Sequence, residues 1–165
     1  EFAKILRHHG KEGAVHTKIG YNWRMSEINA ILGVYQLQRL DEFIEKRNYV
    51  AKRYVDGLSS LENLTLIHVP SNTRHSFWKH PVILNSIKAP NLEKLFLEKY
   101  QIALGTIYYP PIHLQPLYKD KFGYSDGMLP VSEDILLRET CLPMFVDISD
   151  EMIDTVIKCI KLEVK

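Results

Sequence analysis

The sequence predicts an α+β domain in which a few short strands are separated by helices that cover one face of a sheet. Residues 26–58 carry apolar side chains three and four positions apart, which is the spacing of a long amphipathic helix. Three shorter runs, at 64–69, 76–84 and 102–107, are typical of strands. A helical pattern separates the last two runs. The resulting order, α–β–β–α–β–α, is that of a small mixed layer fold.

The long helix is predicted to begin at Ser26, whose hydroxyl can accept a hydrogen bond from a backbone N–H that the first turn leaves free. Glu27 then places a negative charge at the positive end of the helix dipole. No proline interrupts the pattern, so one helix is expected to run to about Leu58.

Local signals predict the remaining elements. Residues 1–9 are expected to end a helix at Gly10, and a glycine-containing loop over residues 10–24 leads to the long helix. Pro81 is expected at a sheet edge or a bulge, because it has no N–H to donate to a neighbouring strand. The other expected elements are a helix over 92–100 capped by Asn91, an irregular proline-rich loop over 108–116, short helical turns at 117–121 and 131–140, a short strand or extended entry at 141–144, and a last helix from Asp150 capped by Ser149.

Composition narrows the class of protein. The 165 residues are 45% hydrophobic and 25% charged, as in a folded globular domain. The formal net charge is only +1, and basic residues are interleaved with acidic ones, which argues against a nucleic-acid surface. No apolar run reaches the length of a membrane-spanning helix.

The cysteines and histidines indicate no metal site. Cys141 and Cys159 lack the spacing of a metal or redox motif and lie among apolar residues, so both are expected to be reduced core residues of a cytoplasmic protein. His8 and His9 are adjacent on a predicted helix and would point about 100° apart, which makes them a poor chelating pair. The first residues resemble the middle of a helix and no initiator methionine precedes them, so the chain is expected to be part of a longer protein.

Several landmarks then occur in an order that one enzyme family shares. They are GYNWRMSEI at 20–28, His75-Ser76-Phe77, YPPIHLQP at 109–116, and Leu142-Pro143. In this order they resemble the C-terminal part of the DegT-type sugar aminotransferases, which are fold-type I enzymes that depend on pyridoxal 5'-phosphate (PLP). The resemblance implies transfer of an amino group, typically from glutamate, to a keto group of a nucleotide-linked sugar. It also implies that residues 1–58 are the end of a large domain with a connecting helix, and that residues 59–165 form the small C-terminal domain.

The resemblance also implies roles for particular residues. Asn22 matches a family asparagine that reaches the cofactor phosphate of the partner subunit, and its amide N–H₂ can donate to phosphate without adding a charge. Such a contact requires a homodimer. Arg24 either supports the same phosphate or anchors the loop to a carboxylate such as Glu27. The positions that match substrate-side segments of relatives are Tyr109, His113 and His75.

The main departure from the family pattern concerns catalysis. Family members hold PLP on a lysine of the large domain and set an aspartate against the pyridine nitrogen, and this chain has neither motif. No catalytic residue is therefore expected here, and the chain alone is expected to be inactive. Two alternatives stay open: a non-catalytic module that binds a partner or a sugar nucleotide, and a regulatory or cyclitol-directed member of the same family.

Overall fold

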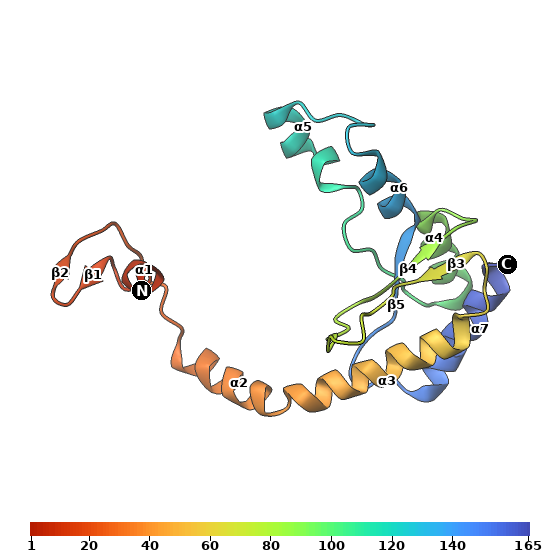
Figure 1. The fold of residues 1–165 in the computed structure, drawn as a ribbon, viewed down its shortest axis with the longest axis horizontal. Helices are drawn as coiled ribbons and strands as arrows, with labels where there is room; N and C mark the ends of the chain where they lie inside the picture. The colour runs from red at the N-terminus through yellow and green to blue at the C-terminus, as the bar shows by residue number, and fades with distance from the viewer. The chain divides into compact units, whose positions relative to one another are not determined.

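A computed structural model describes all residues, 1–165, and divides them into two compact units, Glu1–Asp41 and Glu42–Lys165 (Figure 1). The boundary between these units lies near the start of helix α3 (Leu40–Leu58). The division at residue 58 expected from the sequence concerns the domains of an intact enzyme, and it stays a prediction. No helix of the chain combines the length and apolar character needed to cross a membrane.

The first unit begins with a short helix and a hairpin. Helix α1 (Phe2–Leu6) is followed by β1 (Lys11–Glu12) and β2 (Val15–His16), which pair in antiparallel fashion. The first helix therefore ends three residues earlier than expected, and the expected loop over 10–24 contains a two-stranded hairpin. Gly10 lies in the left-handed region at φ +72°, which allows the chain to turn after α1.

Helix α2 (Glu27–Gln38) begins as the sequence predicts. The Ser26 hydroxyl accepts a hydrogen bond from the Asn29 backbone N–H at 3.3 Å, which satisfies one free donor of the first turn. The end of α2 differs from the prediction, because the structure separates α2 from α3 at Arg39. There the backbone N–H of Arg39 bonds to the Gln36 carbonyl at 3.2 Å, a three-residue step that tightens the last turn.

The second unit is built on a three-stranded antiparallel sheet in the order β3-β4-β5. The strands are β3 (Leu64–Leu66), β4 (His80–Leu84) and β5 (Glu139–Leu142). The strand that contains Pro81 is thus central, not at the sheet edge. The register explains how proline fits there, since β3 ends one residue short of Pro81 and only β5 lies beside it, through Cys141.

Two other predicted elements differ from the structure. The segment 102–107 does not form a strand, and Gly105 makes only an isolated bridge to Cys141. Helix α4 (Ala89–Tyr100) begins three residues before the predicted start, with Lys88 rather than Asn91 at the cap position. A proline in the first turn of α4 makes this earlier start favourable, because its missing N–H has no helical partner to lose.

One core cluster joins the sheet to helices α3, α4 and α7 (Asp150–Glu163). On β4, Val82 and Leu84 are fully buried in this cluster, and the residue between them is only half-buried. All four residues of β5 are buried, so both faces of the sheet are covered at that strand. Helix α7 starts at the predicted cap, where Ser149 Oγ accepts from the Met152 backbone N–H at 3.2 Å. Both cysteines are buried and free, as predicted.

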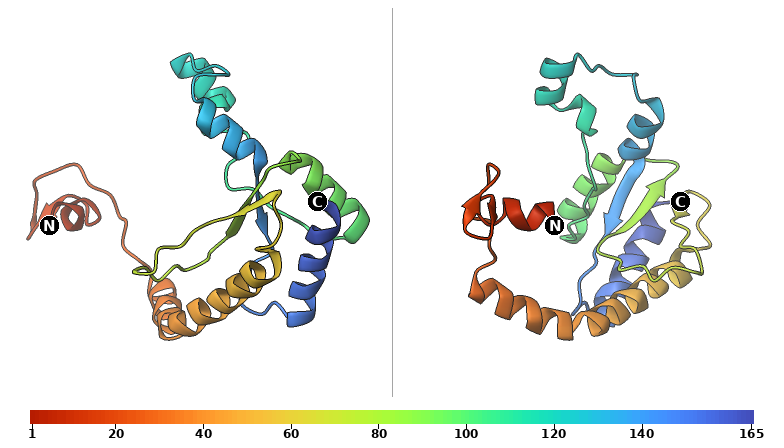
Figure 2. Two further views of the ribbon diagram at one scale, coloured as in Figure 1. Left: turned by 45° about the vertical axis from the view of Figure 1, so that its right-hand side comes forward. Right: turned by 60° about the vertical axis from the view of Figure 1, so that its left-hand side comes forward.

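Residues 108–138, which we call the arm, leave the sheet before β5 (Figure 2). The arm contains a 3₁₀ turn η1 (Ile112–Leu114) and two helices, α5 (Pro116–Phe122) and α6 (Pro130–Arg138). These helices lie close to the two predicted helical turns. Neither α5 nor α6 contains a buried residue, so the arm has little core of its own.

Candidate functional site

In the first unit, the backbone holds Asn22 beside the end of α1. Asn22 forms an antiparallel bridge with His8, and the next residue, Trp23, donates its N–H to the Arg7 carbonyl at 3.0 Å. The Asn22 side chain itself is exposed. The segment therefore has a defined backbone, and it leaves the amide of Asn22 available to a ligand.

Gly10 and Gly20, which precede Asn22 in the chain, allow two backbone segments to lie in close contact. A Cβ atom on Gly20 would lie 1.9 Å from the backbone nitrogen of Gly10, and one on Gly10 would lie 1.8 Å from the Lys18 carbonyl oxygen. No larger residue fits either position without moving the backbone. These contacts explain two of the glycines in the predicted loop.

Arg24 lines a cavity of about 680 Å³ whose walls are mostly charged. The charged side chains that share this cavity are Lys4, Arg7, Lys11, Glu1 and Glu12, together with the imidazole of His8. Four cationic side chains face two carboxylates, so the cavity is net positive. Partial burial, and then the charge of Arg24, hold the pKa of His8 below its ordinary value. Such surroundings suit an anionic ligand.

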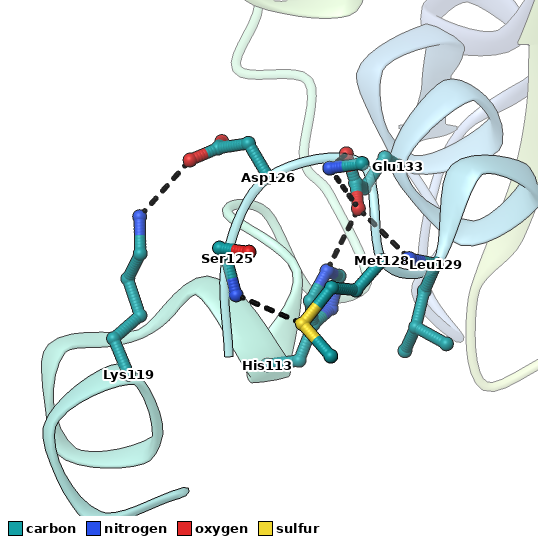
Figure 3. Close-up of polar contacts among 8 residues, drawn as sticks. His113, Lys119, Ser125, Asp126, Met128, Leu129 and Glu133 are labelled. Atoms are coloured by element: carbon teal, nitrogen blue, oxygen red, sulfur yellow. Dashed lines mark hydrogen bonds and ion pairs between the residues drawn. The ribbon is translucent and has the colours of Figure 1, made fainter. Parts of the chain in front are cut away.

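In the second unit, a contact between His113 and Glu133 joins η1 to α6 within the arm (Figure 3). His113 is only 6% exposed, and its Nε2 lies 3.0 Å from Oε1 of Glu133. The Glu133 carboxylate also accepts the backbone N–H groups of Gly127, at 2.9 and 3.0 Å, and Leu129, at 3.1 Å. The N–H of Gly127, then His113 and Leu129, hold the pKa of Glu133 below its ordinary value, so this carboxylate is ionised at neutral pH.

The arm carries two separate cavities. His113 lines one of about 630 Å³, a volume typical of small-molecule sites. The aromatic side chains around it are Tyr108, Tyr118, Phe122 and Tyr124. Tyr109 lines the other cavity, of about 360 Å³, together with Glu133. The structure therefore places two predicted substrate-side residues in different cavities, and Pro111 is common to both linings.

His75 lies outside the arm and lines neither of its cavities. Its carbonyl accepts from the side-chain amide of Asn48 at 2.9 Å, and its Nδ1 accepts from the Phe77 backbone N–H at 3.0 Å. Phe77 has a φ of +42°, an uncommon conformation for a bulky residue. His75 thus belongs to a tightly bonded turn that precedes β4.

Glu133 was not among the residues selected from the sequence. Its only local signal is an acidic side chain near the start of a helix, and it lies 20 residues from His113. No group of three or more His, Cys, Asp or Glu side chains is arranged to hold a metal ion.

Residues 1–161 match the model of the DegT/DnrJ/EryC1/StrS aminotransferase family. The chain is 28% identical to GDP-perosamine synthase of Escherichia coli O157:H7, over 92% of this chain and 41% of that protein. It is 32% identical to a pleiotropic regulatory protein of Geobacillus stearothermophilus, over 92% of this chain and 40% of that protein. The PLP form of a putative sugar aminotransferase, Spr1654 of Streptococcus pneumoniae, superposes with a TM-score of 0.85 at 25% identity, over 96% of this chain and 41% of that chain. The chain thus spans about two fifths of the length of these relatives.

Proposed function

Because the chain belongs to the DegT/DnrJ/EryC1/StrS aminotransferase family, we propose that it is the C-terminal part of a PLP-dependent enzyme that transfers an amino group from glutamate to a keto group of a nucleotide-linked sugar. The observation that carries this proposal is the family match, which extends over almost the whole chain. The similarity to a GDP-perosamine synthase supports a nucleotide-linked sugar as the substrate. The nature of the sugar and of the nucleotide would depend on the rest of the enzyme.

The first unit supplies groups that fit a cofactor phosphate. Asn22 offers an exposed amide N–H₂, and Arg24 adds positive charge at a net positive cavity. PLP, when bound, supplies the electron sink that amino-group transfer needs. In this proposal Asn22 contacts the phosphate held by the partner subunit, and Arg24 supports it. The intact enzyme is therefore a homodimer, and we place it in the cytoplasm.

The second unit supplies the groups proposed for the sugar nucleotide. His113 lines a cavity with four aromatic side chains, and Tyr109 lines the neighbouring one. Aromatic rings with a few polar groups are typical walls of small-molecule sites. His75 borders the same substrate from the turn before β4 in this proposal.

The activity proposal predicts different behaviour for the intact enzyme and for this chain. The full-length protein, supplied with PLP, glutamate and a panel of nucleotide-linked keto-sugars, is expected to release 2-oxoglutarate. The 165-residue chain in the same assay is expected to show no turnover, because it lacks the lysine that would hold the cofactor. Turnover by the chain alone, or none by the full-length protein with any sugar of the panel, would contradict the proposal.

A regulatory or purely binding role is the second candidate, favoured by the 32% identity to a pleiotropic regulatory protein. It predicts that the full-length protein binds a nucleotide-linked sugar in a calorimetric titration without releasing 2-oxoglutarate.

Replacing Asn22 by alanine in the full-length enzyme is expected to weaken PLP binding by about tenfold or more, since a hydrogen bond to a charged group contributes about 1.5–3 kcal/mol. The unfolding midpoint should change no more than it does for an ordinary surface substitution, because the side chain is exposed. Equilibrium dialysis of PLP measures the first effect and urea unfolding the second. Asn29→Ala, at an exposed position on α2, is the matched control. Equal PLP affinity in the two variants would exclude the phosphate role.

A further inference from the structure

The three donors around Glu133 define where His113 carries its proton. An ionised carboxylate accepts hydrogen bonds and donates none. Glu133 already accepts the backbone N–H groups of Gly127 and Leu129, so its contact with His113 is also one in which the carboxylate accepts. The donor in this contact must be Nε2–H of His113. In a neutral imidazole, Nδ1 is then the unprotonated nitrogen and carries the free lone pair.

The chain leaves Nδ1 of His113 unused. The structure contains no hydrogen bond to this atom, and the atom is not among the fully enclosed side-chain nitrogens that lack a partner. The same ring lines the aromatic cavity of the arm. His113 therefore has one nitrogen that is held by protein and another that is free to receive a ligand.

The backbone on either side of the ring is also restrained. The Leu114 N–H donates to the Pro111 carbonyl at 2.9 Å, and the Gln115 side-chain amide donates to the Pro110 carbonyl at 3.0 Å. These bonds close the 3₁₀ turn that carries His113. With the backbone held by this turn, the contact with Glu133 determines the rotation and the tautomer of the ring.

We propose that Glu133 is a positioning residue, which holds His113 as the Nε2–H tautomer so that Nδ1 accepts a hydrogen bond from a hydroxyl or amide N–H of the ligand. The sugar hydroxyls of a nucleotide-linked sugar provide such donors, and its phosphate oxygens do not. With Nδ1 unprotonated, His113 thus selects the sugar portion rather than the diphosphate. The identity of the ligand rests on the proposed function, but the tautomer of His113 and its dependence on Glu133 do not.

Nitrogen-15 NMR of histidine rings tests the tautomer directly in the 165-residue chain. The chain contains seven histidines, and His113→Gln identifies the signal of His113 by its loss. At a pH where the ring is neutral, the wild-type signal is expected to show a protonated Nε2 and an unprotonated Nδ1. A wild-type ring protonated at Nδ1 would overturn the proposal, whatever the variants do.

Glu133→Ala tests the dependence on the carboxylate. Oε1 of Glu133 accepts from His113 as well as from Gly127 and Leu129, so a glutamine oxygen at that position would still accept Nε2–H. Alanine removes the acceptor, so a mixture of the Nε2–H and Nδ1–H tautomers of His113 is expected. Glu45→Gln, an exposed carboxylate on α3, should leave the His113 signal unchanged, and Glu133→Asp should restore part of the Nε2–H tautomer. A Glu133→Ala chain whose backbone amide spectrum keeps its dispersion and whose His113 stays fully Nε2–H would refute the positioning role.

The full-length enzyme separates this proposal from the activity proposal. In Glu133→Ala, the KM for the keto-sugar nucleotide is expected to rise about tenfold, which corresponds to one hydrogen bond, while the KM for glutamate stays unchanged. If the Glu133 variant changes the tautomer of His113 as expected but the full-length wild-type protein is inactive, the aminotransferase proposal is rejected and the positioning role stands. A normal tautomer shift with an unchanged KM in an active enzyme would remove Nδ1 as a ligand contact.

Discussion

Replacing Phe96 by alanine is expected to lower the free energy of unfolding of the second unit by about 3–5 kcal/mol, the range for deleting a buried aromatic ring. Phe96 has no exposed surface, belongs to the core cluster, and packs edge-on against Tyr100 with ring centres 5.3 Å apart. Alanine suits a helix, so the loss reports on the cavity rather than on α4 itself. A loss of this size is a large fraction of the about 5–15 kcal/mol that a domain has in total.

The neighbouring residue supplies a matched control. Leu97 lies on the same helix and is 59% exposed, so Leu97→Ala should change the free energy of unfolding by less than about 0.5 kcal/mol. Urea unfolding followed by far-UV circular dichroism compares the two variants. If both midpoints move by the same amount, the core does not lie where the structure places it.

Acidification from pH 7 to pH 5 is expected to destabilise the second unit by about 2 kcal/mol through His80 alone. His80 is 4% exposed, packs beside Tyr54 and Phe77, and has no hydrogen-bond partner on either ring nitrogen. Burial, with a smaller effect of His75, lowers the pKa of His80 to about 4.

The direction of this effect follows from where the proton binds. An unfolded chain protonates His80 near its ordinary pKa of about 6.5, whereas the folded chain does so only near 4. Between these pH values the unfolded state binds a proton at His80 and the folded state does not, so the free energy of unfolding falls as the pH falls through this window. Below about pH 4 both states are protonated and the His80 contribution becomes constant.

Urea unfolding at pH 7, 6 and 5 isolates the contribution of His80. Between pH 7 and pH 5, the free energy of unfolding of His80→Leu is expected to fall by about 2 kcal/mol less than that of the wild type, because leucine does not titrate. His68→Leu, at an exposed position, should follow the wild-type pH profile. A His80→Leu profile parallel to that of the wild type would show that His80 is not buried as a neutral ring.

Elements governed by neighbours in sequence were predictable. Ser26 and Ser149 cap α2 and α7 as expected, because an N-cap acts on a backbone N–H only three residues away. The predicted start of α4 was wrong, because a proline in the first turn of this helix outweighed the capping preference of Asn91. The strand expected over 102–107 was wrong for a different reason. A strand needs a ladder of bonds to a partner, and this segment bridges β5 only at Gly105, opposite Cys141.

The candidate site divides in the same way. Asn22, Arg24, Tyr109, His113 and His75 were selected because short motifs resemble a family, and their roles stay predictions. The sequence contained no sign that Tyr109 and His113 line different cavities, or that Glu133 holds His113. Side chains 20 positions apart meet only after the arm has folded.

The sequence by itself determined the family and the α+β class, because both depend on the order of motifs and patterns along the chain, and the two serine caps, because a cap depends on residues three positions apart. Tertiary structure alone decided that β4 is central, that His80 is buried without a partner, and that Nε2 of His113 faces Glu133. The physical reason is that strand order, burial and side-chain hydrogen bonds depend on segments far apart in the chain. Their packing selects one arrangement among many that the local pattern permits.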